Sequence, residues 1–261
     1  MGSSEIQGKL WGQKSKDWAK IQEPTGISGY KHALQLLNLE TNQTLLDIGC
    51  GTGFFSNMVN EQGINVTGID ASKELIEQAN ERSPEVKFSV GEMEKLPFLD
   101  NTFDVVCGFN SFQYATDTKN ALLEAKRVLK NKGRLVTMIW GNKEDCEANS
   151  CLKAIGSLLP PAPPNSGGPF GLSENRLLES IIESIGLKIT SNNDITSIWE
   201  YPNVDVAMKG LLSAGPAAKA IENSGFEKSY KTILDSMQPY IKKDGRVIYN
   251  NKWRVVICEK L

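Results

Sequence analysis

The residues best suited to chemistry in this sequence form a glycine-rich turn, Gly49-Cys50-Gly51-Thr52-Gly53. Between a strand and a helix, such a turn lets a ligand approach backbone N–H groups that side chains would otherwise cover. A phosphate-binding P-loop would end in a lysine and a hydroxyl residue, but here two phenylalanines follow. A dinucleotide site would need the spacing GxGxxG, which Phe54 interrupts. The turn therefore favours a third kind of ligand.

Two acidic residues frame the turn and indicate what that ligand is. Asp47 lies two residues before the first glycine, and Asp70 ends the next expected strand. A carboxylate at position 47 would repel a pyrophosphate but suits an ammonium group, and one at position 70 can accept two hydrogen bonds from ribose hydroxyls. A ligand with a cationic amino-acid part and a ribose is S-adenosylmethionine. We therefore predict that this turn binds S-adenosylmethionine.

The elements that must position these residues follow from hydrophobic patterning. Short apolar runs alternate with helical spacing, and the run at 103–109 is continuous enough to be buried on both faces. Strands are expected at 44–48, 65–70, 86–90, 103–109, 134–140, 187–201 and 253–259, with helices at 54–62, 73–82, 119–129 and 174–185. Repeated strand–helix units predict an α/β, Rossmann-like fold: a seven-stranded, mostly parallel sheet with helices on both faces.

The expected organisation has three parts. Residues 1–40 form a helical lead segment, residues 41–140 the cofactor-binding α/β core, and residues 141–261 the remainder of the sheet. Insertions at about 141–172 and 203–243 precede the sixth and seventh strands, where they would cover a ligand crevice. The first insertion is expected to lack regular structure, and its proline-rich stretch 160–164 is interpreted as a surface linker or a lid. Ser173 is expected to cap the helix at 174–185.

Composition excludes several classes of function. Lys and Arg total 29 against 31 Asp and Glu, so there is no basic surplus for nucleic acid. Five cysteines without a CxxC pair and a single histidine argue against a disulfide framework or a metal centre, and no metal is predicted. No apolar run approaches the ~20 residues that span a bilayer, and the first residues lack a secretion signal. We expect a cytoplasmic protein without a membrane partner; the sequence does not indicate its oligomeric state.

Four runs of this sequence resemble a known family. They are LLDIGCGTG, GID ending in Asp70, VGEMEKLPFLDNTFDVV and ALLEAKRVLKNKGRLV, all between about residues 30 and 140. They resemble class I S-adenosylmethionine-dependent methyltransferases of the type 11, ubiquinone-biosynthesis-like group. The resemblance implies that the turn contacts the methionine part, Asp70 the ribose and Glu92 the adenine amino group, although aspartate is commoner at that position. The implied cofactor site comprises Trp18, Tyr30, Asp47, Gly49, Cys50, Gly51, Thr52, Gly53, Asp70, Ala71, Glu92, Met93 and Asn110.

The implied reaction is an in-line displacement that yields S-adenosylhomocysteine and depends mainly on alignment. No catalytic residue is assigned: His32 and Tyr114 are candidate bases, Glu23 could pair with an amine, and the histidine that many relatives carry near Tyr114 is absent. The substrate pocket is expected at Gln113, Tyr114, Trp140 and Trp199. The acceptor is predicted to be an O or N atom of a small molecule, natural product or peptide. A non-catalytic S-adenosylmethionine-binding protein and a nicotinamide-dependent oxidoreductase remain alternatives.

Overall fold

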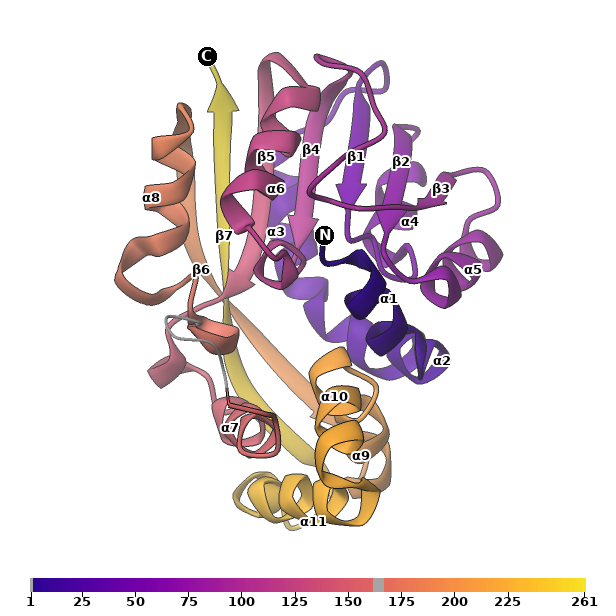
Figure 1. Cartoon of the computed structure of the whole chain (residues 1–261), viewed down its shortest axis with the longest axis vertical. Helices are drawn as coiled ribbons and strands as arrows, with labels where there is room; N and C mark the ends of the chain where they lie inside the picture. Colours follow the sequence, from indigo (N-terminus) through magenta and orange to yellow (C-terminus); the bar gives the residue numbers. More distant parts are fainter. Residues whose placement is uncertain (1, 162–166) are drawn as a thin grey trace.

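The computed structural model describes residues 2–161 and 167–261. Seven strands form one sheet in the order β3-β2-β1-β4-β5-β7-β6 (Figure 1). Strands β1 to β5 are parallel, and β7 pairs antiparallel with both β5 and β6. The predicted seven-stranded, mostly parallel sheet is confirmed. The strands are β1 Thr44–Ile48, β2 Asn65–Asp70, β3 Lys87–Val90, β4 Phe103–Phe109, β5 Leu129–Trp140, β6 Leu187–Tyr201 and β7 Val247–Lys260.

Helices cover both faces of the sheet because successive strand residues point to opposite sides. Leu45 of β1 packs in one core with helices α3 and α4, whereas its neighbour Leu46 packs in a second core with α6 and α8. Each strand is thereby buried twice, which explains its continuous apolar sequence. These helices are α3 Ile27–Leu37, α4 Phe54–Asn60, α6 Thr118–Val128 and α8 Leu177–Ser184; α5 Lys73–Arg82 packs beside β2 and β3.

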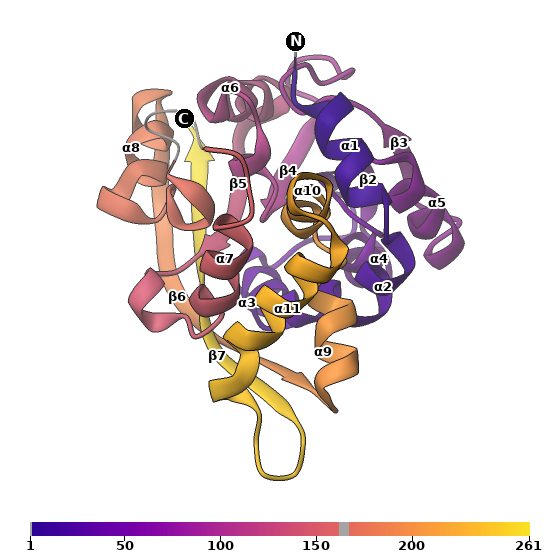
Figure 2. The ribbon, with the colours of Figure 1, turned by 60° about the horizontal axis from the view of Figure 1, so that its bottom comes forward.

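The remaining helices gather below the carboxyl ends of the parallel strands, where α7 packs on α10 and α11, and α1 packs on α10 (Figures 1 and 2). They are α1 Ser4–Gly12, α2 Ser15–Asp17, α7 Asn149–Gly156, α9 Val204–Leu211, α10 Gly215–Ser224 and α11 Phe226–Met237. Between α2 and α3 the chain forms a π-helix, η1 Trp18–Gln22, and a 3₁₀-helix, η2 Glu23–Gly26. Further 3₁₀ turns are η3 Phe112–Tyr114, η4 Lys143–Asp145, η5 Gly168–Phe170, η6 Glu174–Arg176 and η7 Gln238–Tyr240. We call α7, α9, α10 and α11 the cap.

Strands β6 and β7 extend beyond the other strands toward the cap. Only residues 253–259 of β7 pair with β5, while Val247 to Trp253 pair with the last seven residues of β6. The expected start of this strand at residue 253 is therefore six residues late. The extra residues are held by β6 alone, a pairing between distant segments that local patterning does not reveal. Strand β5 likewise begins at Leu129, five residues earlier than expected.

Three local predictions in the first insertion and after it are wrong. The stretch 141–172 was expected to lack regular structure, but it contains α7, whose Cys151 and Ile155 are buried one turn apart. The helix expected over 174–185 is α-helical only from Leu177, because Asn175 and Arg176 adopt left-handed backbone angles. Ser173 does not cap it; its hydroxyl donates to the Trp140 carbonyl instead. In the proline-rich stretch, residues 162–164 lie outside the described residues.

None of the helices within the two described ranges has both the length and the apolar run that crossing a membrane requires.

Candidate active site

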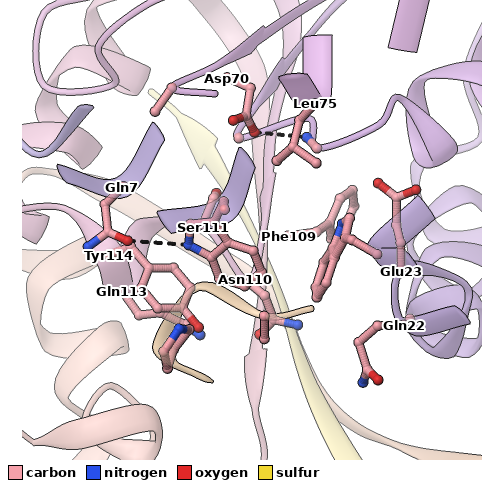
Figure 3. A pocket seen from close by; sticks show the side chains of 18 of the residues that line it. Gln7, Gln22, Glu23, Asp70, Leu75, Phe109, Asn110, Ser111, Gln113 and Tyr114 are labelled. Carbon is pink, nitrogen blue, oxygen red and sulfur yellow. Dashed lines mark hydrogen bonds between the residues drawn. The ribbon is translucent and has the colours of Figure 1, made fainter. Parts of the chain in front are cut away.

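A large cavity lies at the carboxyl ends of β1, β2, β4 and β5, between the core, the lead segment and the cap (Figure 3). It holds about 1310 Å³ of empty space, including its open mouth. Of the sequence-predicted cofactor residues, its wall includes Trp18, Tyr30, Gly49, Gly51, Asp70, Ala71, Glu92, Met93 and Asn110. Nine of the thirteen expected cofactor residues therefore lie on the wall of one cavity.

The glycine turn is folded onto the end of β2. The N–H groups of Gly49 and Cys50 both donate to the Ile69 carbonyl, at 2.7 and 3.1 Å. Gly51 has a φ of 57°, in the left-handed region that favours glycine. A Cβ added to Gly51 would come within 2.6 Å of the Glu23 carboxylate. The turn thus needs glycine here both for its backbone angle and for close approach of the lead segment.

Asp70 lies beside this turn, and its carboxylate can accept further hydrogen bonds. Its Oδ2 accepts the Gly51 N–H and its Oδ1 accepts the Ser72 N–H, each at 2.9 Å. A carboxylate offers about four lone pairs, so about two remain for a ligand. Burial raises the pKa of Asp70 to about 6, and the two backbone hydrogen bonds partly offset this. At neutral pH the group is a carboxylate on the cavity wall, which fits a ribose diol.

Asp47 does not reach the cavity. It is only 2% exposed, its Oδ2 accepts the Ser56 hydroxyl at 2.7 Å, and its Oδ1 accepts the Cys107 thiol at 3.5 Å. Burial raises its pKa to about 7. Three residues of the turn also lie off the cavity wall: Cys50, Thr52 and Gly53. The structure therefore brings together only part of the expected cofactor site.

Glu92 lies on the cavity wall, where it holds the start of α1. Its Oε2 accepts the Ser4 N–H at 2.8 Å, and the neighbouring Glu94 accepts the Ser3 N–H at 3.1 Å. Burial disfavours the charged form of Glu92, but hydrogen bonds from Glu94, Ser4 and Ser3 outweigh it and hold its pKa below the usual range. The unpaired N–H groups of a helix start attract such carboxylates. Glu92 and Glu94 thus hold the start of the lead segment at the cavity through hydrogen bonds to its backbone.

Replacing Glu92 with alanine is expected to loosen the start of α1, because the Ser4 N–H loses its acceptor. Amide hydrogen exchange in residues 3–8 should accelerate by about tenfold, matching the ~1.5 kcal/mol lower value of a hydrogen bond to a charged group. The matched control is Glu5→Ala, which also removes a glutamate next to Ser4, in the first turn of α1, but one whose side chain is exposed. Equal exchange rates in both variants would contradict the role given to Glu92.

The far end of the cavity is aromatic. Trp140, Trp199 and Trp253, which we call the tryptophan cluster, have ring centroids 4.4 to 6.1 Å apart. All three line the cavity, together with the expected pocket residues Gln113 and Tyr114. The sequence did not predict Trp253 as a pocket residue, because it did not indicate that β7 pairs with β5. In that pairing Trp253 lies directly opposite Trp140. In the described part of the chain, the indole N–H groups of Trp199 and Trp253 are buried without a hydrogen-bond partner.

The charges on the cavity wall are acidic. Glu23, Asp70 and Glu92 line it, and no Lys, Arg or His does so among the described residues. His32 lies on α3, away from this wall. Burial raises the pKa of Tyr114 above its usual value, so its phenol stays protonated at neutral pH and is a hydrogen-bond donor rather than a base. Tyr114 is thus on the wall but protonated, and His32 lies away from the wall, so neither candidate is available as a base there at neutral pH.

Comparison with known proteins identifies the family and the fold. The sequence profile of the methyltransferase domain family matches residues 46–137. A demethylmenaquinone methyltransferase of Thermotoga maritima is 35% identical over 210 residues, covering 79% of this chain and 80% of that protein. A ubiquinone/menaquinone biosynthesis C-methyltransferase of Campylobacter jejuni is 27% identical over 213 residues, covering 77% and 79%. The solved YcgJ protein of Bacillus subtilis has the same fold, with a TM-score of 0.59 at 21% identity over 88% of this chain and 97% of that one.

A Rossmann-like sheet of this strand order, with a glycine turn and an acid at the end of β2, defines the class I methyltransferase fold. The chain belongs to the type 11 methyltransferase domain family. It is an S-adenosylmethionine-dependent methyltransferase, and its cofactor is S-adenosylmethionine.

Proposed function

We propose that this enzyme transfers the methyl group to an oxygen or nitrogen atom of a small, uncharged or cationic organic acceptor that binds at the tryptophan cluster. The observation that carries the proposal is a single cavity whose wall runs from Gly51 and Asp70 to Trp140, Trp199 and Trp253. When bound, S-adenosylmethionine supplies a methyl group on a sulfonium, a good leaving group. Two ligands held end to end in this cavity would need little more than alignment, which is worth about 7–11 kcal/mol of barrier.

Each part of the chain has a role in this proposal. Asp70 holds the ribose through its spare lone pairs, and the methionine part lies on the cavity wall beside Gly51 and Glu23. The rings of the tryptophan cluster orient a flat or apolar acceptor and exclude water. The buried indole N–H groups of Trp199 and Trp253 would then donate to polar atoms of the acceptor, since a buried donor without a partner costs about 1–3 kcal/mol.

The charge of the cavity limits the acceptor. Because its charged side chains are acidic and no cation lines it in the described part of the chain, a carboxylate or phosphate on the acceptor would be desolvated without compensation. A neutral amine fits best, because it is nucleophilic before it loses a proton. A hydroxyl acceptor would have to give its proton to a carboxylate of the wall, because Tyr114 stays protonated at neutral pH. Peptides with a neutral end remain within this class.

A second candidate is methylation at carbon. It is favoured by the similarity to the Campylobacter jejuni relative, a C-methyltransferase whose match covers 77% of this chain. Carbon methylation would require an acceptor that is already nucleophilic at carbon, such as an electron-rich ring, because neither His32 nor Tyr114 is available as a base in the cavity. An aromatic wall such as the tryptophan cluster also suits such a ring.

The test begins with calorimetric titration of S-adenosylmethionine, S-adenosylhomocysteine and NADH. We expect micromolar binding of the first two and none of NADH; the reverse would revive the oxidoreductase alternative. Neutral, cationic and anionic small aromatic acceptors are then incubated with S-adenosylmethionine labelled with ¹³C in its methyl group. The product's ¹³C chemical shift identifies the methylated atom. Methylation only of anionic acceptors would overturn the proposal, and binding without turnover across the panel would favour the non-catalytic alternative.

A further inference from the structure

We propose that Glu23, rather than Asp47, is the carboxylate that binds the ammonium group of S-adenosylmethionine. This inference rests on the proposed function, because it assigns a residue to the cofactor of that site. The sequence analysis predicted that Asp47, which precedes the glycine turn, binds the ammonium group. In the structure, Glu23 lies on the cavity wall and Asp47 lies behind it.

The lead segment is built to present Glu23 to the glycine turn. The chain changes from a π-helix to a 3₁₀-helix between Gln22 and Glu23, a local departure from α-helix that is frequent at functional sites. The Tyr201 hydroxyl donates to the Gln22 side chain at 2.8 Å, and the Ser197 hydroxyl donates to the Thr25 carbonyl at 3.0 Å. These two bonds anchor the segment to β6 on either side of Glu23. Glu23 is 5% exposed, and its carboxylate lies at the cavity wall beside Gly51 (Figure 3).

The hydrogen bonds of Glu23 leave one acceptor position open. Its Oε1 accepts the Thr52 N–H at 2.8 Å, while its Oε2 accepts the Thr52 hydroxyl and the Arg82 guanidinium. Three of about four lone pairs are therefore used, and the remaining one is on Oε1. This same Oε1 is the atom that a Cβ on Gly51 would meet at 2.6 Å. A donor lying over the backbone at Gly51, where the methionine part is expected, would meet it directly.

The charge arrangement also favours a cation at this place. Arg82 bonds Glu23 at 2.8 Å and the Thr52 carbonyl at 2.8 Å, but it does not line the cavity. The ion pair is therefore oriented with its negative end toward the cavity. Asp70 adds a second carboxylate on the same wall. An ammonium group would be the first cation to face this end of the cavity within the described residues.

Asp47 does not face the cavity. Its two oxygens accept hydrogen bonds from Ser56 and Cys107, and the residue does not line the cavity wall. An ammonium group on the ligand would be separated from Asp47 by the turn itself. Its electrostatic contribution is consequently indirect, whereas that of Glu23 is a contact.

The experiment compares two ligands that differ in the amino-acid part. S-adenosylhomocysteine carries the ammonium group, and methylthioadenosine has the same nucleoside without it. Affinities are measured by calorimetry, with methylthioadenosine in competition against S-adenosylhomocysteine. We expect Glu23→Gln to weaken S-adenosylhomocysteine by about 10- to 100-fold, the loss of a hydrogen bond to a charged group, and methylthioadenosine by less than about threefold. Asp47→Asn should change the ratio of the two affinities by less than about threefold.

The outcomes separate this inference from the proposed function. If the parent chain binds neither ligand, the proposed function itself fails. If the parent binds both, and Glu23→Gln weakens both equally or neither, only the role of Glu23 is overturned; the same holds if Asp47→Asn gives the selective loss. Should Glu23→Gln unfold because Arg82 loses its partner, the double variant Glu23→Gln/Arg82→Gln removes the ion pair together, and the same selective loss is expected.

Discussion

Asp70→Ala is expected to bind S-adenosylmethionine about 10- to 150-fold more weakly than the parent chain. The substitution removes a cavity-wall carboxylate with about two lone pairs left for the ribose in the proposed site, and a hydrogen bond to a charged group is worth about 1.5–3 kcal/mol. It also leaves the Gly51 N–H without the acceptor that folds the turn onto β2. Both effects reduce affinity, and calorimetric titration measures their sum. Parental affinity in Asp70→Ala would contradict the assignment of Asp70 to the cofactor.

The pH dependence of S-adenosylmethionine binding tests the contribution of the Asp70 carboxylate. The pKa of Asp70 is raised by burial to about 6, so in the parent chain the charged form is lost as the pH falls through about 6. A protonated carboxyl accepts fewer hydrogen bonds, and the affinity should fall with it. Asp70→Asn keeps the shape without titrating, so its weaker affinity should vary less with pH than that of the parent. An identical pH profile in parent and variant would contradict this explanation.

Asp47→Asn is expected to stabilise the fold at neutral and alkaline pH. Burial raises the pKa of Asp47 to about 7, against about 3.8 in an unfolded chain, so the folded state holds the proton more tightly. Its contribution to stability is therefore greatest below about pH 4 and is lost as the pH rises to about 7, at about 1.4 kcal/mol per unit. Asparagine can still accept the Ser56 hydrogen bond without the cost of a buried charge.

The measurement is the free energy of unfolding by denaturant for parent and variant. The advantage of Asp47→Asn should grow by about 3 kcal/mol between pH 5 and pH 7 and then level off. The control is Asp100→Asn, because Asp100 is exposed and pairs only at the surface with Arg127. A pH-independent difference between Asp47→Asn and the parent would show that Asp47 is not the titrating group.

Much of the core could be predicted because its signals are local. Parallel strands buried on both faces are continuously apolar, so β1, β2 and β4 were expected within a residue of their observed bounds. The glycine turn and Asp70 are also local signals, set by the backbone angles of the turn and by the end of β2. The insertions were harder, because α7 packs on α10 and α11, which come much later in the chain, and the Ser173 hydroxyl bonds the Trp140 carbonyl instead of capping a helix.

The sequence by itself determined the fold class, the glycine turn and the cofactor that it suits, since each depends on residues a few positions apart. Only the tertiary structure decided which acids face the cavity. Glu23 meets Thr52 across 29 residues, and Glu92 meets Ser4 across 88. Trp253 meets Trp140 only because β7 returns antiparallel beside β5. Such pairings arise from chain topology, which brings distant segments to one edge of the sheet, and no local pattern encodes them.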